Sequence, residues 1–368
     1  MTTINNLLSS LLIEENNNTL YSFSNADGKR WIMPAKRMKT GMNLYQPSGI
    51  KGKLLKKLFP YLHRIGLVRK RLHAEVIHCR LRDDMCNLLC QSFGVERLEF
   101  SIFGGTPSVH QKITIQLNIG NRILGYCKVS DSEEVLPLFE HESYILETLH
   151  AKGIADIPQC LFCGTLYDGI GVFVQTTAKT NRSRVVHDWM PLQNQFLINL
   201  YEKTRQKLLF QNTDYYQTLI ALKEHIDCLP EGVDGHMVMT AIGNVLSEYS
   251  GSEVEFSAYH ADFTPWNMFV EDNRLFVFDF EYARLTYPPM LDRYHFFLQT
   301  ANFERHWTVE EIITYIQSKE GEWVDNRMFV FYLLSVMSQF AIREQGNVTG
   351  DVAKSFSIWS NLLKYLLQ

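Results

Sequence analysis

Three polar side chains within residues 259–280 have the types and the spacing that suit phosphoryl transfer. Asp262 is followed five residues later by Asn267, and Asp279 comes twelve residues after Asn267. An aspartate can accept the proton of an attacking hydroxyl, and the side-chain oxygens of Asn and Asp are ligands of Mg²⁺ in nucleotide sites. We therefore predict that Asp262 is a catalytic base and that Asn267 and Asp279 bind Mg²⁺.

Short strands around this segment would hold the three side chains in place. Pro265 prevents a helix from running through the loop. The apolar runs 268–270 and 275–278 flank a polar turn, which predicts a β-hairpin that delivers Asp279 at a strand end. A single Asp or Asn in a loop more often caps a turn than binds a metal, so the prediction depends on the combination.

The composition is that of a folded chain. Of 368 residues, 46% are hydrophobic and 21% are charged, which excludes a disordered protein and allows one large core or two moderate ones. The seven cysteines have no regular disulfide spacing, and Cys160-x-x-Cys163 lacks a second pair for a zinc site. Neither a signal peptide nor a run of 18 apolar residues is visible. We expect a soluble protein of a reducing cytoplasm.

The residues before this segment have the pattern of an antiparallel sheet with turns between its strands. Gly104 and Gly105 lie in the first turn, where backbone N–H groups could approach phosphates, although Gly-Gly is also an ordinary hairpin turn. The predicted strands cover residues 98–103, 112–119, 123–129, 157–164 and 171–177.

Lys128 lies late in an apolar strand, where a lysine is costly unless its ammonium reaches an anion. The alternative is an edge-strand lysine that points to solvent. Glu142 precedes Leu146 by four residues in a helical pattern, so it shares the face that turns inward. Glu140 and Glu147 are the alternatives for this inward position, and we favour Glu142.

The pattern becomes helical beyond a polar linker at residues 179–184. Several of the helical runs begin with Asp or Thr, which are common N-cap residues. The predicted helices cover residues 192–209, 215–227, 237–249, 292–303, 308–319, 327–343 and 352–367.

The pattern His260-x-Asp262-x-x-x-x-Asn267, followed by Asp279-Phe-Glu, resembles the catalytic and metal-binding segments of the aminoglycoside phosphotransferase and choline kinase family. That family belongs to the protein-kinase-like superfamily. The resemblance implies an α+β, two-lobed kinase-like fold with a small antiparallel-sheet lobe, a mostly helical large lobe and an N-terminal extension. The domains implied are an extension at 1–95, a small nucleotide-binding lobe at 96–178 and a helical catalytic lobe at 179–368.

The same resemblance implies the cofactors ATP and Mg²⁺ and a role for each matching residue. Lys128 would contact the α- and β-phosphates and would be fixed by Glu142. Gly104 and Gly105 would cover the nucleotide, and backbone near residues 175–177 would bind adenine.

His260 and Asp292 are supporting residues by the same resemblance. His260 would hold the loop through hydrogen bonds, and Asp292 would brace it, although Asp292 could equally be a helix N-cap. The family commonly has Gly where Ala261 and Trp266 stand. Trp266 would shape the acceptor pocket, so the acceptor of this protein cannot be inferred from the acceptors of other family members.

Residues 51–82 form a basic segment outside this resemblance. They contain ten Lys or Arg and one acid, Glu75, interleaved with apolar side chains. Such an amphipathic segment can lie at an anionic membrane surface, contact nucleic acid, or be a solvated helical face packed on the small lobe. The other elements show no pattern of nucleic-acid recognition. Peripheral contact with the inner face of a membrane stays open.

Together these features favour an ATP- and Mg²⁺-dependent phosphotransferase that acts on a hydroxyl of a small molecule, such as a sugar or a glycan-linked acceptor. Only twelve residues separate Asp279 from Asp292, which leaves no room for the activation segment of a protein kinase. The alternatives are a nucleotide-binding regulatory scaffold (a pseudokinase) and an atypical protein kinase. Retention of Lys128, Asp262, Asn267 and Asp279 argues against a scaffold.

Overall fold

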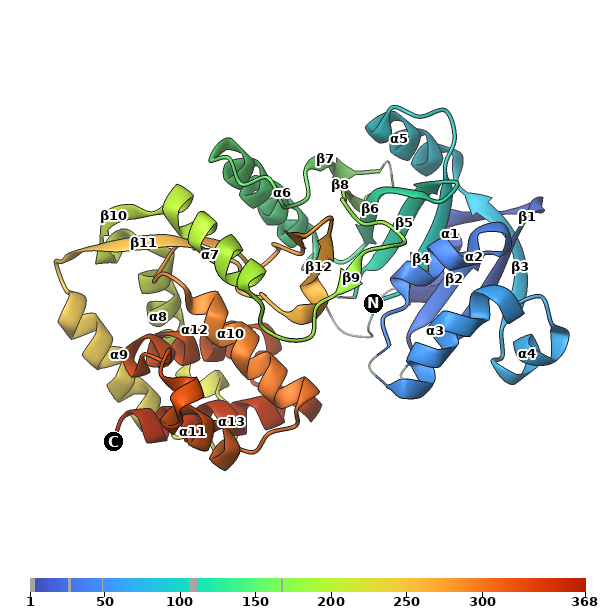
Figure 1. Ribbon diagram of the computed structural model, residues 1–368. Helices are drawn as coiled ribbons and strands as arrows, with labels where there is room; N and C mark the ends of the chain where they lie inside the picture. Colours follow the sequence, from blue (N-terminus) through green and yellow to red (C-terminus); the bar gives the residue numbers. More distant parts are fainter. Residues whose placement is uncertain (1–3, 26–27, 48, 106–110, 167) are drawn as a thin grey trace. The chain divides into compact units, whose positions relative to one another are not determined.

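The chain divides into two compact units. The computed structural model describes residues 4–25, 28–47, 49–105, 111–166 and 168–368. Unit 1 consists of Met1–His150, Asp156–Arg184 and Val270–Phe276, and unit 2 consists of Ala151–Ala155, Val185–Phe269 and Val277–Gln368. Unit 1 is built on a β-sheet and unit 2 is mostly helical, which confirms the predicted α+β class (Figure 1).

In the described residues, eight strands form the sheet of unit 1 in the order β3-β1-β2-β4-β5-β6-β8-β7. Every neighbouring pair is antiparallel. The strands are β1 (Leu12–Ser24), β2 (Arg30–Pro34), β3 (Glu75–Leu81), β4 (Glu99–Phe103), β5 (Ile113–Ile119), β6 (Arg122–Ser130), β7 (Cys160–Thr165) and β8 (Gly171–Thr176). The strands predicted between residues 98 and 177 are therefore confirmed as β4 to β8.

The first ninety-five residues supply β1, β2 and β3 to the same sheet. The basic segment 51–82 forms two helices, α3 (Ile50–Leu62) and α4 (Gly66–Arg71), and then β3. The prediction of a helical face therefore holds for only part of this segment, because residues 75–81 form a strand that pairs with β1. At the end of that strand Cys79 and Leu81 are buried, and Arg80 between them is half-buried. The domain boundary expected at residue 95 stays a prediction, and the sheet crosses it.

Side chains on the two faces of this sheet enter two hydrophobic clusters, because neighbouring residues of a strand point to opposite faces. In β2, Ile32 joins a cluster that includes residues of α1 (Ile4–Leu11) and α5 (Asp83–Phe93). Trp31 and Met33 join another that includes Met38 of α2 (Met38–Gly41) and Phe59 of α3. Helices thus cover both faces of the N-terminal strands (Figure 1).

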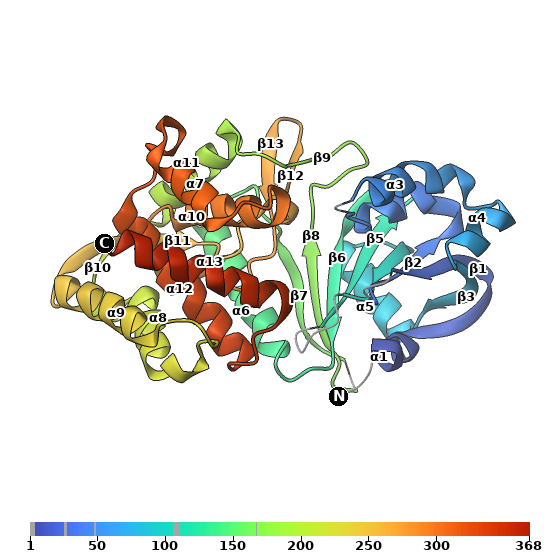
Figure 2. The ribbon, with the colours of Figure 1, turned by 90° about the horizontal axis from the view of Figure 1, so that it is seen from below.

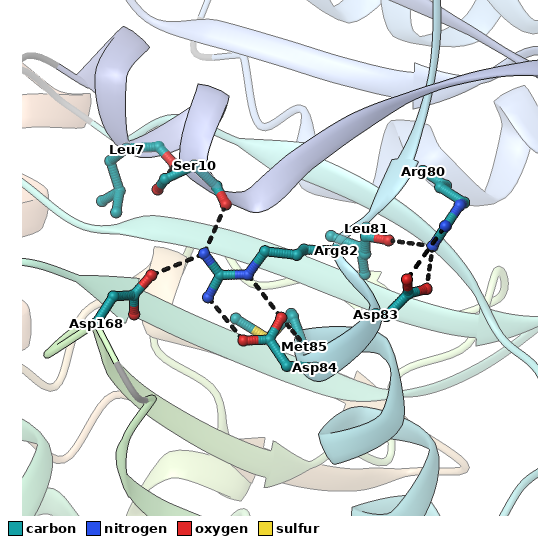
Figure 3. A network of polar contacts seen from close by, with 9 residues as sticks. All are labelled: Leu7, Ser10, Arg80, Leu81, Arg82, Asp83, Asp84, Met85 and Asp168. Carbon is teal, nitrogen blue, oxygen red and sulfur yellow. Dashed lines mark hydrogen bonds and ion pairs between the residues drawn. The ribbon is translucent and has the colours of Figure 1, made fainter.

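Arg82 ties the N-terminal elements to the rest of unit 1 (Figure 3). Its Nη1 donates to the carbonyl of Ser10 at 3.0 Å and to Asp168 Oδ2 at 2.7 Å, in the turn between β7 and β8. Its Nε and Nη2 donate to both carboxylate oxygens of Asp84, at 2.6 and 2.8 Å. A guanidinium suits such a network because its donors form a planar fork. This network lowers the pKa of Asp84 and of Asp168.

Unit 2 combines a small antiparallel sheet with helices that surround α12. Its helices are α7 (Pro191–Thr204), α8 (Asp214–Glu224), α9 (Gly235–Tyr249), α10 (Leu291–Gln299), α11 (Val309–Gln317), α12 (Asn326–Glu344) and α13 (Gly350–Leu366). The sheet pairs β10 (Gln206–Leu209), β11 (Glu253–Tyr259) and β14 (Arg284–Tyr287). Helix α12 packs against α8, α9, α10 and α13 (Figure 2). The predicted hairpin is present as β12 (Met268–Glu271) and β13 (Arg274–Val277), and its residues Val270–Phe276 belong to unit 1.

Two of the predicted helices differ most from the structure at their C-terminal ends. The helix predicted over residues 192–209 ends at Thr204, because residues 206–209 pair with β11 as strand β10. The helix predicted over 292–303 ends at Gln299 and continues as one π-helical turn, Thr300–Glu304. In the first case pairing with a neighbouring strand overrides the local helical pattern.

The remaining predicted helices of unit 2 are present. Side-chain caps fix several of them: Thr213, Asp234, Thr308 and Asp325 each accept a hydrogen bond from a backbone N–H in the first helical turn. Among the described residues, the structure contains no helix that is long and apolar enough to cross a membrane.

Candidate active site

The loop after β11 is held by a buried carboxylate from α10. Asp292 Oδ2 accepts the backbone N–H of His260 at 2.8 Å, and its Oδ1 accepts that of Ala261 at 3.1 Å. Asp292 is 2% exposed, and burial raises its pKa from 3.8 to about 7. The two backbone donors act in the opposite direction, because they favour the charged carboxylate. Through these two hydrogen bonds Asp292 holds the backbone of the loop at His260 and Ala261.

The backbone of this loop adopts a conformation that side chains usually avoid. Ala261 has a φ of 68°, in the left-handed region. Asp279 and Met290 also have positive φ, at 72° and 65°. Non-glycine residues in this region are often found at functional sites, where surrounding contacts hold them. The hydrogen bonds to Asp292 are such contacts for Ala261.

His260 is a structural support for the loop. It is fully buried, its Nε2 lies 3.1 Å from the carbonyl of Phe278, and its Nδ1 accepts the backbone N–H of Asp262 at 3.2 Å. These two bonds define a neutral ring with its proton on Nε2. Burial lowers the pKa of His260 to about 4, which agrees with a neutral ring. A ring in this state joins β11 to the end of the hairpin.

Asp262 presents its carboxylate from this loop, with a side chain that is 32% exposed. Asn267 Nδ2 donates to Asp262 Oδ2 at 2.7 Å and to its backbone carbonyl at 3.1 Å. On the other carboxylate oxygen, His295 Nε2 lies 3.3 Å from Oδ1. Both oxygens therefore have a side-chain partner, while part of the carboxylate still faces solvent.

The structure adds two residues that the sequence reasoning missed. His295 lies on α10 and is 2% exposed, and Tyr332 on α12 is fully buried. The hydroxyl of Tyr332 lies 3.2 Å from His295 Nδ1. His295 follows Asp292 by three residues, so both lie on one face of the helix. This spacing could have indicated from the sequence that His295 lies near the loop that Asp292 contacts. Nothing in the sequence links Tyr332 to the loop.

The predicted metal ligands lie at one end of the β12–β13 hairpin. The backbone N–H of Phe278 donates to the carbonyl of Asn267 at 3.0 Å, and Asp279 follows directly. Because Asn267 uses its amide nitrogen on Asp262, its Oδ1 is the atom that it can offer to a cation. Asp279 is half-buried, and Glu281 two residues later is 7% exposed. An amide oxygen and carboxylates are a donor set that fits a hard cation such as Mg²⁺.

In unit 1, the predicted ion pair is present. Lys128 Nζ lies 2.6 Å from Glu142 Oε2, and the two residues are 5% and 0% exposed. Lys128 lies opposite Thr114 of β5 and Phe173 of β8, so it is not on an edge strand. Glu142 belongs to α6 (Leu136–Ala151), on which Glu140 and Glu147 are exposed. The structure thus favours Glu142 over both alternatives, and its role with a nucleotide stays a prediction.

The predicted glycine turn is described only in part, because residues 106–110 lie outside the described residues. Gly104 donates its backbone N–H to Arg30 at 2.8 Å, and its carbonyl accepts Gln111 Nε2 at 2.8 Å. Gly105 has a φ of 75°, and a Cβ there would lie 2.4 Å from the carbonyl oxygen of Lys112. The backbone conformation and the close carbonyl oxygen therefore explain why residue 105 is a glycine. Contact of Gly104 and Gly105 with a phosphate stays a prediction.

No family model matches the chain, and no curated protein matches its sequence. Solved structures do match. A thermostable mutant of aminoglycoside phosphotransferase APH(4)-Ia, in its apo form, has a TM-score of 0.50 and 14% sequence identity, over 76% of this chain and 98% of that chain. The GDP complex of aminoglycoside 2'-phosphotransferase-IIIa has a TM-score of 0.48 and 12% identity, over 77% of this chain and 98% of that chain.

The choline kinase LicA from Streptococcus pneumoniae has a TM-score of 0.47 and 15% identity, over 77% of this chain and 99% of that chain. At such identities a structural match shows the fold alone. The match to the APH(4)-Ia structure shows that this chain has the kinase-like fold of that enzyme, which confirms the predicted fold.

Proposed function

We propose that the protein is an ATP- and Mg²⁺-dependent phosphotransferase that acts on a hydroxyl group of a small molecule. The observation that carries the proposal is the setting of Asp262, a partly exposed carboxylate with a side-chain partner at each oxygen. A fixed carboxylate that still meets solvent can receive a substrate hydroxyl. The kinase-like fold supports the proposal, since it is the fold of an aminoglycoside phosphotransferase.

In the proposed reaction, Asp262 orients the acceptor hydroxyl and takes its proton. The acceptor oxygen forms a bond to the γ-phosphorus, and the bond between that phosphorus and the bridging oxygen of ADP breaks. Asn267 and Asp279 would hold Mg²⁺, which supplies positive charge against the phosphate oxygens. In unit 1, the ammonium of Lys128 would contact the nucleotide phosphates, and Glu142 would keep it in place.

An aromatic pair beside the loop supports an acceptor with a ring. Trp266 is 37% exposed and Phe303 is 39% exposed, and their rings meet edge to face with centroids 6.2 Å apart. Phe303 lies on the π-helical turn, and Trp266 precedes the proposed metal ligand Asn267. Exposed aromatic rings can pack against the apolar face of a sugar, while Asp262 takes a hydroxyl. We therefore favour a sugar or a glycan-linked acceptor.

Two other functions compete with this proposal. A regulatory scaffold would bind nucleotide without turnover, and the intact set of Lys128, Glu142, Asp262, Asn267 and Asp279 argues against it. An atypical protein kinase would need a peptide platform after Asp279. Residues 284–287 instead form β14, which pairs with β11, and α10 begins at Leu291. A small acceptor therefore fits this stretch better than a peptide.

Asp262→Asn tests the proposal most directly. The substitution keeps the size of the side chain and removes its basicity, so phosphate transfer should fall by about 10²–10⁴-fold while Mg·ATP binding stays unchanged. Transfer from labelled ATP to a panel of sugars, nucleosides, aminoglycosides and amino alcohols gives the rate, and calorimetry gives the affinity. Asp188→Asn, at a side chain that is 75% exposed, is the matched control. Wild-type transfer by Asp262→Asn would exclude this residue as the base.

We also propose that α3 and α4 bind an anionic membrane surface. Ile50, Leu54, Leu58, Tyr61 and Ile65 recur at helical spacing and are between 41% and 86% exposed. Residues 50–71 contain eight Lys or Arg and no Asp or Glu. An exposed apolar stripe with basic flanks complements anionic headgroups above an apolar layer. Each cation near such a surface contributes about 1 kcal/mol.

Vesicle flotation tests this second proposal. The wild-type chain should float with phosphatidylserine-containing vesicles at low salt and less at high salt, and Ile50→Glu with Leu54→Glu should abolish flotation. Ile119→Glu, at a residue that is 43% exposed at the end of β5, should float as the wild type does. Absence of wild-type flotation, or flotation of the double variant, would leave an acidic protein partner as the better reading of this surface.

A further inference from the structure

His295 is a buried histidine that contacts the proposed base directly. It lies on α10, one turn after Asp292, and both its ring nitrogens have a polar neighbour. Nε2 lies 3.3 Å from Asp262 Oδ1, and Nδ1 lies 3.2 Å from the hydroxyl of Tyr332. Four side chains are thus connected in one row, in the order Tyr332, His295, Asp262 and Asn267.

The chemistry of the two neighbours fixes the direction of these hydrogen bonds. A carboxylate only accepts, so the ring must donate its Nε2–H to Asp262. Burial raises the pKa of Tyr332 well above 10, so its hydroxyl keeps its proton. In a neutral ring that donates from Nε2, the Nδ1 lone pair accepts the Tyr332 O–H. The Asp262 carboxylate therefore selects the Nε2–H tautomer of His295, and the Tyr332 hydroxyl complements that tautomer as a donor to Nδ1.

The result is a carboxylate that is held at two points. Asn267 donates to Oδ2 and His295 donates to Oδ1, so rotation about the Cβ–Cγ bond would break one bond or both. Each carboxylate oxygen can accept about two hydrogen bonds, which leaves acceptor capacity on the exposed side of Asp262. Positional errors near 1 Å at a reacting group can cost about 10²-fold in rate.

We infer that His295 is a positioning residue that holds the Asp262 carboxylate in the orientation needed to accept the proton of the acceptor hydroxyl. This inference rests on the proposed function of Asp262. It assigns two tasks to one helix, because α10 holds the loop backbone through Asp292 and the carboxylate through His295. The alternative is a core histidine that contributes only packing and stability.

Replacement of His295 by leucine and by glutamine separates these alternatives. Leucine fills space without a donor, so kcat should fall by about 10- to 100-fold while KM for the acceptor and the affinity for Mg·ATP stay unchanged. Glutamine can place an amide N–H near the position of Nε2 and should restore most of kcat. Equal losses in both variants, or wild-type kcat in His295→Leu, would overturn the inference.

A double-mutant cycle tests whether His295 acts through Asp262. In an Asp262→Asn background, His295→Leu should cause no further loss of kcat, because the group that it positions is already disabled. A full additive loss would mean that His295 acts independently, which contradicts the inference.

Nitrogen-15 NMR of the ring gives a readout that does not need activity. The wild-type ring should show the Nε2–H tautomer, and Tyr332→Phe should reduce that preference. A ring with its proton on Nδ1 would overturn the inference even if phosphate transfer is found. If no acceptor is phosphorylated by the wild type while the Nε2–H tautomer is present, the proposed function fails and the hydrogen-bonded row remains as structure only.

Discussion

The pair Lys128–Glu142 in unit 1 and the group around Asp262 in unit 2 are built in different ways. Lys128 lies in a strand that is paired on both sides, and Glu142 lies on a helix, so regular backbone places both. Asp262 lies in a loop whose backbone is held by Asp292 and whose carboxylate is held by neighbouring side chains. One region depends on charge complementarity, and the other depends on hydrogen bonds to an irregular backbone.

This difference indicates where each region is vulnerable. Removing one charge of a buried pair leaves the other without its compensation, and this is costly for stability. Removing a support of the loop changes orientation and pH response while most of the core stays intact. Substitutions in the two regions should therefore separate loss of folding from loss of chemistry.

The largest effect on stability is expected from Glu142→Ala. It removes a fully buried carboxylate 2.6 Å from the Lys128 ammonium, so the free energy of unfolding should fall by about 3–5 kcal/mol. Chemical denaturation measures the change. Glu140→Ala, on the exposed face of the same helix, should change it by less than about 0.5 kcal/mol.

A paired replacement sharpens this result. Lys128→Met combined with Glu142→Leu removes both charges and should recover most of the lost stability, because apolar residues often replace a buried ion pair without cost. The double variant should still fail to use nucleotide. A double variant that binds Mg·ATP as the wild type does would show that the pair is structural.

Asp279→Ala should weaken nucleotide binding only when Mg²⁺ is present. It removes a carboxylate from the proposed metal ligands, and we expect a loss of about tenfold or more, or 1.4 kcal/mol. Calorimetry with ATP in the presence of Mg²⁺ and in the presence of a chelator measures both affinities. Equal losses under the two conditions would exclude Asp279 as a ligand.

The loop should also produce a pH dependence that one substitution reveals. The pKa of His260 falls from 6.5 to about 4 on folding, so the unfolded chain binds more protons between these values and this residue adds stability as pH rises from 4 to 6.5. The pKa of Asp292 rises from 3.8 to about 7, so its contribution falls over nearly the same range. The two effects offset each other in the wild type.

His260→Asn removes the first effect and keeps an acceptor for the Asp262 N–H. The stability difference between the wild type and this variant should therefore grow from pH 4 to pH 6.5, by on the order of 2–3 kcal/mol. Denaturation at a series of pH values measures it. A difference that is constant with pH would show that His260 is not held neutral.

The smallest effect is expected from Ala261→Gly. A left-handed backbone costs alanine about 1–2 kcal/mol, and glycine loses about 0.5–1 kcal/mol in additional chain entropy, so the variant should gain about 0.5 kcal/mol. Ala283→Gly is the matched control, since Ala283 is equally buried without a positive φ, and it should lose stability. Destabilisation by both variants would mean that the Ala261 methyl group contributes more by packing than it costs in strain.

The sequence was sufficient for features that depend on local pattern. Apolar runs separated by turns predicted β4 to β8, and the spacing of Glu142 and Leu146 placed Glu142 on the inward face of α6. The hairpin before Asp279 was predicted from two short apolar runs and a polar turn. In each case the residues that determine the structure are close together in the chain.

Features that depend on distant partners were not predicted. His295 lies 33 residues after Asp262 in the sequence, and Tyr332 lies 37 residues after His295. Strand β10 was taken for the end of a helix, because its partner β11 is separated from it by two helices. Strands β1 and β2 were not assigned, since their pairing is decided by the sheet that they join.

The strand order of unit 1 also has a consequence for any shortened version of the chain. Strand β4 pairs with β2 on one side and β5 on the other, so a chain that begins near residue 95 would lack β1 to β3 and would leave β4 at the margin of the sheet. Its unpaired backbone N–H and C=O groups would then be available to strands of other molecules. Such a chain should self-associate. Within one molecule the first ninety-five residues cover this edge of β4 with β2, and in the shortened chain a strand of another molecule would take that place.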